Sequence, residues 1–148
     1  MPEASPEFEQ FQKIQEEHRQ LKTLLEQIET ALTDRSGPIE AVVDLIGQLG
    51  HQLTKHFQTE EAGGYFADAL FEAPQLVNRA NDLMLQHPKM TRSARKLAEA
   101  ADPNKNPDLW WEQTAERFQA LKEELDKHER DEDLLIQEAY TRDIGMND

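Results

Sequence analysis

Apolar residues along this chain recur at steps of three and four positions, the spacing that places side chains on one face of a helix. The first series is Phe11, Ile14, His18, Leu21, Leu25, Ile28 and Leu32, and the second is Val42, Ile46, Leu49, Leu53, His56 and Glu60. The third is Leu76, Ala80, Leu83, His87, Met90, Ala94 and Leu97. The fourth is Trp111, Thr114, Phe118, Leu121, Leu125, His128, Glu132, Leu135 and Ala139. This pattern predicts four amphipathic helices.

Clusters of turn-forming residues separate the four series. They are TDRSGP at 33–38, AGG at 62–64, EAP at 72–74 and DPNKNP at 102–107. A proline lacks the N–H that the first turn of a helix leaves unpaired, which favours first helical positions for Pro38, Pro74 and Pro107. Asn106 is predicted to cap the last helix. Gly63 and Gly64 are predicted to end the second helix by adopting positive φ.

Four amphipathic helices joined by mostly short loops predict an all-α protein with an up-down-up-down four-helix bundle. The 148 residues suffice for one domain with one core. We expect that domain to span 1–148, with its folded core at about 8–142 and a frayed tail at 143–148. Stretch 65–73 fits a helix extension, a turn or a cap on the bundle, and the pattern leaves it unassigned.

Each predicted helix places a histidine in its core-facing series, and two of the helices add a glutamate. The six residues are His18, His56, Glu60, His87, His128 and Glu132. A buried imidazole or carboxylate without a partner costs several kcal/mol, so six of them require mutual contacts or a bound cation. Metal coordination is the simplest explanation of the set.

Two of the ligand-type pairs are four residues apart, which makes them neighbours on one helix face: His56 with Glu60, and His128 with Glu132. One ion cannot readily use six side chains from four helices, whereas two ions can. In antiparallel hairpins of similar length, His18 lies at the height of His56, and His87 at that of His128. The sequence therefore predicts a pseudo-twofold site with two histidines per metal ion.

Taken one at a time, several of these and other polar residues have simpler explanations than coordination. His18 or His87 taken alone fits a satisfied core histidine or a register-setting polar residue better than a ligand. His51 lies off the core-facing series and is interpreted as a surface histidine. Glu61 and Asp133 lie one position off the series, so solvated groups or outer supports of the ligands are the favoured readings, with direct coordination as the alternative.

Composition excludes several classes of function. The chain has no cysteine, which rules out disulfide scaffolds, cysteine-type zinc sites, iron-sulfur clusters and thiol catalysis. Thirty acidic residues against sixteen basic ones give a formal charge of −14, which repels nucleic acid and anionic lipid. The sequence shows no signal peptide pattern and no apolar stretch of membrane-spanning length, so a cytoplasmic location is the expectation.

The lone His18, HFQTE at 56–60, HP at 87–88 and HERDE at 128–132 together resemble the hemerythrin-like HHE cation-binding domain family. The resemblance covers about 10–142 and implies a four-helix bundle that holds a non-haem di-iron centre of the Fe–O–Fe type. By that resemblance His18, His56, His87 and His128 are terminal ligands, and Glu60 and Glu132 bridge two iron ions. Nitrogen-rich ligation suits iron, with zinc or manganese as substitutes, better than magnesium or calcium.

The chain departs from the oxygen-carrying members of that family, which have a second histidine one turn along the third helix. Here Thr91 follows His87 by one turn and Leu83 precedes it by one turn. Four imidazoles and two bridging carboxylates fill about eight of about twelve positions on two octahedral ions, which leaves open positions. The pattern is closer to the bacterial iron-centre-repair and sensor branches. The His-x-x-x-Glu pairs also distinguish the chain from ferritin-like proteins, which use Glu-x-x-His.

These features predict a metal-binding protein that binds dioxygen, nitric oxide or peroxide for sensing, storage or redox protection. An iron-dependent oxidoreductase or an iron donor for damaged iron centres is the first alternative, and catalytic turnover would distinguish it. An iron-responsive interaction module without catalysis is the second, and a purely structural bundle is the least favoured. No residue is assigned a catalytic role, and any protein partner is left open.

Overall fold

The computed structural model of the chain describes residues 6–62, 73–99 and 101–147, with side chains from 12 to 139 within those ranges. They form α1 (Pro6–Asp34), α2 (Ile39–Ala62), the short 3-10 helix η1 (Pro74–Leu76), α4 (Val77–Lys96), the 3-10 helix η2 (Leu97–Glu99) and α5 (Pro107–Asn147). Within these ranges the chain contains helices and turns but no strand, which confirms the all-α prediction. No helix in the described part is long and apolar enough to cross a lipid bilayer.

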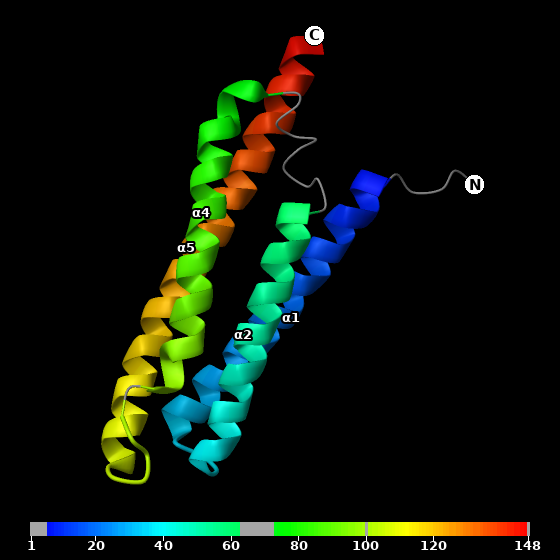
Figure 1. Cartoon of the computed structure of the whole chain (residues 1–148). Coiled ribbons are helices and arrows are strands. Elements are labelled where there is room, and N and C mark those ends of the chain that lie inside the picture. The colour runs from blue at the N-terminus through cyan, green and yellow to red at the C-terminus, as the bar shows by residue number, and fades with distance from the viewer. Residues whose placement is uncertain (1–5, 63–72, 100, 148) are drawn as a thin grey trace, which may run out of the picture.

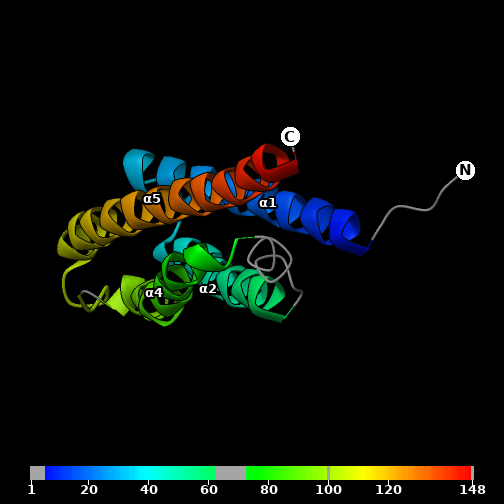
Figure 2. The same cartoon turned by 90° about the horizontal axis from the view of Figure 1, so that it is seen from above.

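The four long helices lie around a common axis. Figure 1 shows α1 running down from the N-terminal end, α2 returning beside it, α4 running down again and α5 returning to the C-terminal end. Seen from above in Figure 2, α1 and α5 lie on one side and α2 and α4 on the other. Helix α1 contacts α2 and α5, and α4 contacts the same two helices. Side chains that face the axis therefore share one interior.

The helix termini follow the predicted chemistry with two shifts. Pro107 is the first residue of α5, and the Asn106 side chain caps that helix by accepting a hydrogen bond from the Leu109 N–H at 3.1 Å. Pro38 instead precedes the first residue of α2, and Pro74 begins η1 and not the long helix α4. A proline at any of these places removes only an N–H that the helix start leaves unpaired. The predicted terminators Gly63 and Gly64 lie outside the described residues.

Helix α1 ends with a residue in the left-handed region. Arg35 has a φ of 47°, and the Ser36 N–H donates to the Ala31 carbonyl at 3.3 Å, as in a Schellman ending. A side chain with a Cβ is strained there, so Arg35→Gly is expected to raise the free energy of unfolding by about 1 kcal/mol. Urea denaturation of the metal-free protein measures the change. Arg35→Ala is the control, because it keeps the Cβ and should give no gain.

The predicted core-facing series are buried wherever their side chains are described, apart from the partly exposed His18. Most of the apolar core lies toward the end where α1 joins α2, and it includes Ile28, Leu49, Trp110 and Phe118. A smaller apolar cluster lies toward the other end; its members are Ala73, Leu76, Ala80, Leu83, Leu135, Ile136 and Ala139. The His and Glu residues occupy the layer between the two clusters. The fold therefore encloses a polar layer between apolar ones.

Candidate metal centre

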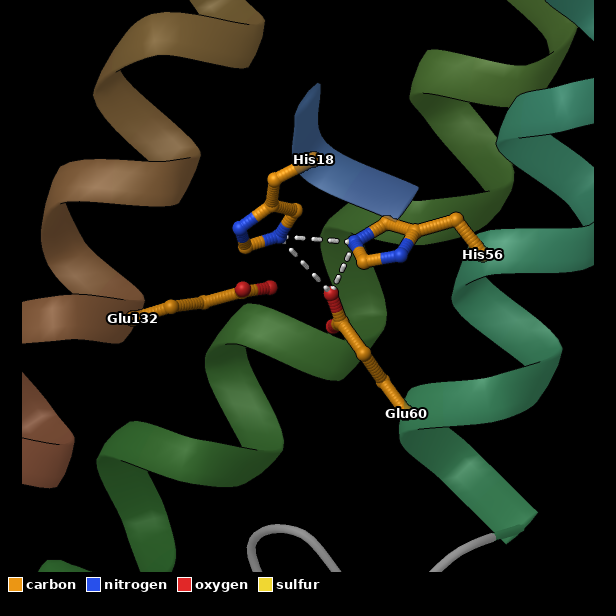
Figure 3. A group of neighbouring side chains, drawn as sticks. All are labelled: His18, His56, Glu60 and Glu132. Atoms are coloured by element: carbon orange, nitrogen blue, oxygen red, sulfur yellow. Dashed lines mark hydrogen bonds and ion pairs between the residues drawn. The ribbon is translucent and has the colours of Figure 1, made fainter. Parts of the chain in front are cut away.

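The structure brings all six predicted ligand residues together. They form two overlapping sets: His18, His56, Glu60 and Glu132, and Glu60, His87, His128 and Glu132. In each set the ligand-type atoms lie within 4.8 Å of one another. Figure 3 shows the first set, in which the two imidazoles point toward each other and the two carboxylates approach from different helices. Glu60 and Glu132 belong to both sets, so two ions could share them.

The spacing of the imidazole nitrogens fits one ion per histidine pair. The Nε2 atoms of His18 and His56 are 3.0 Å apart, and those of His87 and His128 are 3.2 Å apart. Two nitrogens bound at about 2.1 Å in neighbouring positions of an octahedron lie about 3.0 Å apart, and in a tetrahedron about 3.4 Å. The first pair matches octahedral coordination, and the second lies between the two geometries.

Three of the histidines are held at the ring nitrogen that faces away from the centre. Nδ1 of His56 lies 3.1 Å from a Glu17 oxygen, and Nδ1 of His87 lies 2.9 Å from a Glu61 oxygen. The third contact joins Nδ1 of His128 to the Gln86 side-chain oxygen at 2.8 Å. Because these oxygens are acceptors, Nδ1 carries a proton and donates it, so Nε2 is the ring nitrogen that faces a metal ion.

Two of these supporting residues were missed by the sequence interpretation, namely Glu17 and Gln86. Glu17 is only 9% exposed and also accepts a hydrogen bond from the Thr59 hydroxyl at 3.2 Å. A signal for it exists, because Ile14, Glu17 and Leu21 also follow steps of three and four. Gln86 carries no comparable signal, since it lies beside His87 and off the core-facing series.

The remaining candidates fall outside the two sets. Glu61 contacts His87 at Nδ1 and so supports a ligand from outside, one of the two roles proposed for it. Asp133 is exposed and belongs to neither set within the described residues. His51 is exposed, as expected for a surface histidine.

The two shared carboxylates fit a bound cation because they lack ordinary partners. Glu60 is 2% exposed and Glu132 is 1% exposed. Among the described residues, none of their four carboxylate oxygens accepts a hydrogen bond of ordinary geometry, and their close contacts are ion-pair contacts with the imidazole nitrogens. Burying such oxygens without partners costs free energy, which a cation between them would offset. The donor set therefore suits metal ions with mixed nitrogen and oxygen ligation.

The metal-free layer shifts the pKa values of the two carboxyl groups in opposite directions. Burial raises the pKa of Glu60, but three imidazoles, led by that of His18, outweigh it and hold that pKa below its ordinary value. Burial raises the pKa of Glu132 well above its ordinary value, and the charge of Glu60 adds to burial against the opposing contact with His87. The layer therefore favours the charged form of Glu60 and the protonated form of Glu132.

The pKa values of the imidazoles are also shifted in different directions. Burial lowers the pKa of His56, but contacts with Glu60 outweigh burial and raise it. For His87, burial is again opposed, and contacts with Glu132 and Glu60 raise the pKa to about 10. Burial and the positive charge of His87 together lower the pKa of His128 to about 4. Metal binding must therefore displace protons from this layer.

Comparison with known protein families gives a match to part of the chain. Residues 9–74 match the family model of the hemerythrin HHE cation binding domain. Neither the curated proteins nor the solved structures compared with the chain gave a match. The matched segment includes His18, His56 and Glu60, while His87, His128 and Glu132 join them through the fold. The resemblance predicted from the sequence is therefore confirmed over residues 9–74, which match the hemerythrin HHE cation-binding domain.

Proposed function

We propose that this protein is a non-haem di-iron protein with an up-down-up-down bundle, which binds dioxygen, nitric oxide or peroxide for sensing, storage or redox protection. The observation that carries the proposal is the pair of overlapping sets with Glu60 and Glu132 in common. His18 and His56 would hold one ion, and His87 and His128 the other. The six residues fill about eight of about twelve coordination positions, which leaves room for a small ligand.

The bound iron would supply open coordination positions and one-electron redox chemistry. The chain's own residues orient the ligands and limit access of water. Glu17, Glu61 and Gln86 fix the imidazoles through Nδ1. The apolar clusters on both sides of the layer limit the number of water molecules that can compete for the open positions.

The nitrogen spacing at His18 and His56 favours iron over zinc in this proposal, whereas the 3.2 Å spacing at His87 and His128 lies between the two geometries. The 3.0 Å separation of the His18 and His56 nitrogens suits an octahedral ion, whereas structural zinc is almost always tetrahedral. Metal analysis of untagged protein, with optical spectra recorded under air and under nitrogen, tests the assignment. We expect about two iron ions per chain and an absorption that changes with oxygen. Tightly held zinc that does not exchange would instead support a structural role.

An enzyme or iron donor is the alternative for the same centre. An oxygen-binding or sensing protein shows reversible spectral changes without turnover, whereas an oxidoreductase consumes a substrate catalytically. An iron donor loses its iron to an acceptor protein at a rate that depends on the acceptor. Assays of peroxide consumption and of iron transfer to a metal-free iron protein separate these outcomes.

The two proposed metal positions differ in exposure, which predicts that one metal ion can be lost without the other. The His18 side chain is 21% exposed, whereas the side chains of His87 and His128 are almost fully buried. Within the described residues, Nδ1 of His18 has no hydrogen bond. His18→Ala is therefore expected to lower metal stoichiometry from about two to about one ion per chain. Elemental analysis after desalting measures the change. Loss of both ions would contradict independent positions, and His51→Ala is the matched control on the surface.

A further inference from the structure

Phe57 lies against three of the four proposed ligand histidines. Its ring stacks on the imidazole of His87, with centroids 3.9 Å apart and an interplanar angle of 4°. It meets His128 edge to face at 5.9 Å and 69°, and it contacts His56 in a tilted arrangement at 5.8 Å. The side chain is 4% exposed. Nothing in the ligand pattern assigns a role to this ring.

The stack restrains the one motion of His87 that its hydrogen bond leaves free. The contact between Nδ1 and Glu61 restrains one edge of the ring, but the ring could still turn about its Cβ–Cγ bond, because the half-exposed Glu61 side chain can follow. Turning would drive the imidazole face into the parallel ring of Phe57. A metal ion binds the Nε2 lone pair in the plane of the imidazole, so the restraint holds that plane ready for coordination.

The electronic character of the contact acts in the same direction. The face of a phenyl ring carries negative charge density and attracts cations or electron-poor rings. An imidazole becomes more electron-poor when its Nε2 binds a metal ion. The stack therefore stabilises a metal-bound imidazole more strongly than a neutral one.

The contacts of Phe57 are unequally distributed between the two metal positions. His87 and His128, which receive the stacked and the edge contact, belong to one set. In the other set His56 makes only the tilted contact, and within the described side chains His18 makes no ring contact with Phe57. Any effect of the ring on metal affinity must therefore fall mainly on one position.

Resting on the proposed metal binding, we propose that Phe57 is a positioning residue for the ion held by His87 and His128. Its ring fixes the plane of the His87 imidazole and packs against the His128 imidazole. We expect this position to bind its ion more tightly than the position at His18 and His56. The proposal concerns only the affinity of one position, so it can fail while the centre itself stands.

Two half-site variants separate the positions in the test. His18→Ala leaves the position at His87, and His128→Ala leaves the position at His56, so each variant reports on one ion. Cobalt(II) titration followed by absorption gives the affinity of each, with and without Phe57→Leu. We expect Phe57→Leu to weaken binding about 10- to 100-fold in the His18→Ala background and less than about threefold in the His128→Ala background.

Phe118→Leu is the matched control. It makes the same change at a residue that is equally buried but lies in the apolar core, ten positions before His128 and about 15 Å along α5. It should leave cobalt affinity unchanged in both backgrounds. Equal effects of Phe57→Leu and Phe118→Leu would overturn the positioning role. Failure of the wild-type protein to bind cobalt would overturn the proposed metal binding itself.

A measurement on the metal-free protein keeps the proposal testable if Phe57→Leu does not fold. A stacked phenyl ring shifts the carbon-bound protons of the imidazole upfield through its ring current. Proton NMR of the wild-type protein should show this shift for His87, identified by its absence in His87→Gln, and Phe118→Leu should retain it. Unshifted His87 protons would contradict the stack and with it the proposal.

Discussion

Glu132→Gln is expected to abolish tight binding of both metal ions while leaving the metal-free protein folded and at least as stable as the wild type. Glu132 belongs to both ligand sets, so a change there reaches both positions. Replacing groups that only support a ligand typically costs 10- to 100-fold in metal affinity, so losing a shared ligand should cost more than about 100-fold at each position.

The stability of the metal-free variant follows from the protonation state of Glu132. Burial raises the pKa of this carboxyl well above its ordinary value, which favours its neutral form in the metal-free protein. Glutamine has nearly the same shape as a protonated glutamate and carries no charge. The substitution therefore removes a metal ligand without adding a buried charge or a cavity. Metal titration by calorimetry and thermal melting of the stripped protein measure the two effects separately.

Asp133→Asn is the matched control for this prediction. It removes a carboxylate from the next position of the same helix, but Asp133 is exposed and lies outside both sets in the described part of the chain. It should leave both affinities unchanged. If Glu132→Gln retained two tightly bound ions, Glu132 would not be a ligand and the centre would need a different bridge.

The long helices and the inward residues could be predicted because both depend on local spacing. A seam residue such as Leu49 or Phe118 is buried for the same reason as its neighbours three and four positions away. The histidines and glutamates that interrupt the seam share that spacing, so their meeting in one layer follows once the helices are antiparallel. Chain geometry alone thus determines the depth of the polar layer.

The supports of the imidazoles could not be predicted in the same way. Whether Gln86 reaches His128, or Glu17 reaches His56, depends on the relative rotation of two packed helices, which sequence spacing does not specify. The stack of Phe57 on His87 likewise requires that α2 and α4 be neighbours. Contacts between helices therefore had to come from the structure, whereas contacts within a helix did not.

The stripped protein is expected to lose thermal stability as the pH rises from about 6.5 to about 10, whereas the metal-loaded protein is not. His87 has a pKa raised to about 10 in the folded metal-free state, and the pKa of His56 is also raised. Above about pH 6.5, the pKa of histidine in the unfolded chain, the folded state binds more protons than the unfolded state. Stability that is complete below about 6.5 is therefore lost as the pH rises through the folded pKa.

Other groups in the layer do not reverse this trend. The pKa of His128 is lowered to about 4, so its contribution changes only below about 6.5, and the lowered pKa of Glu60 acts at still lower pH. The raised pKa of Glu132 acts in the same direction as that of His87. Each proton lost from the folded state alone changes stability by up to about 1.4 kcal/mol per pH unit.

Metal binding removes these protons, because an imidazole must offer its lone pair to the ion. The metal-loaded protein therefore lacks the titration that destabilises the stripped protein. Its affinity for the metal ion rises with pH, because fewer protons compete for the imidazoles. The melting temperatures of stripped and zinc-loaded protein should diverge steadily between about pH 6.5 and about 9.5. Zinc is used because it avoids redox changes. His87→Gln should reduce the dependence of the melting temperature of the stripped protein on pH. Parallel curves for the two wild-type forms would show that the imidazoles release no protons when metal binds.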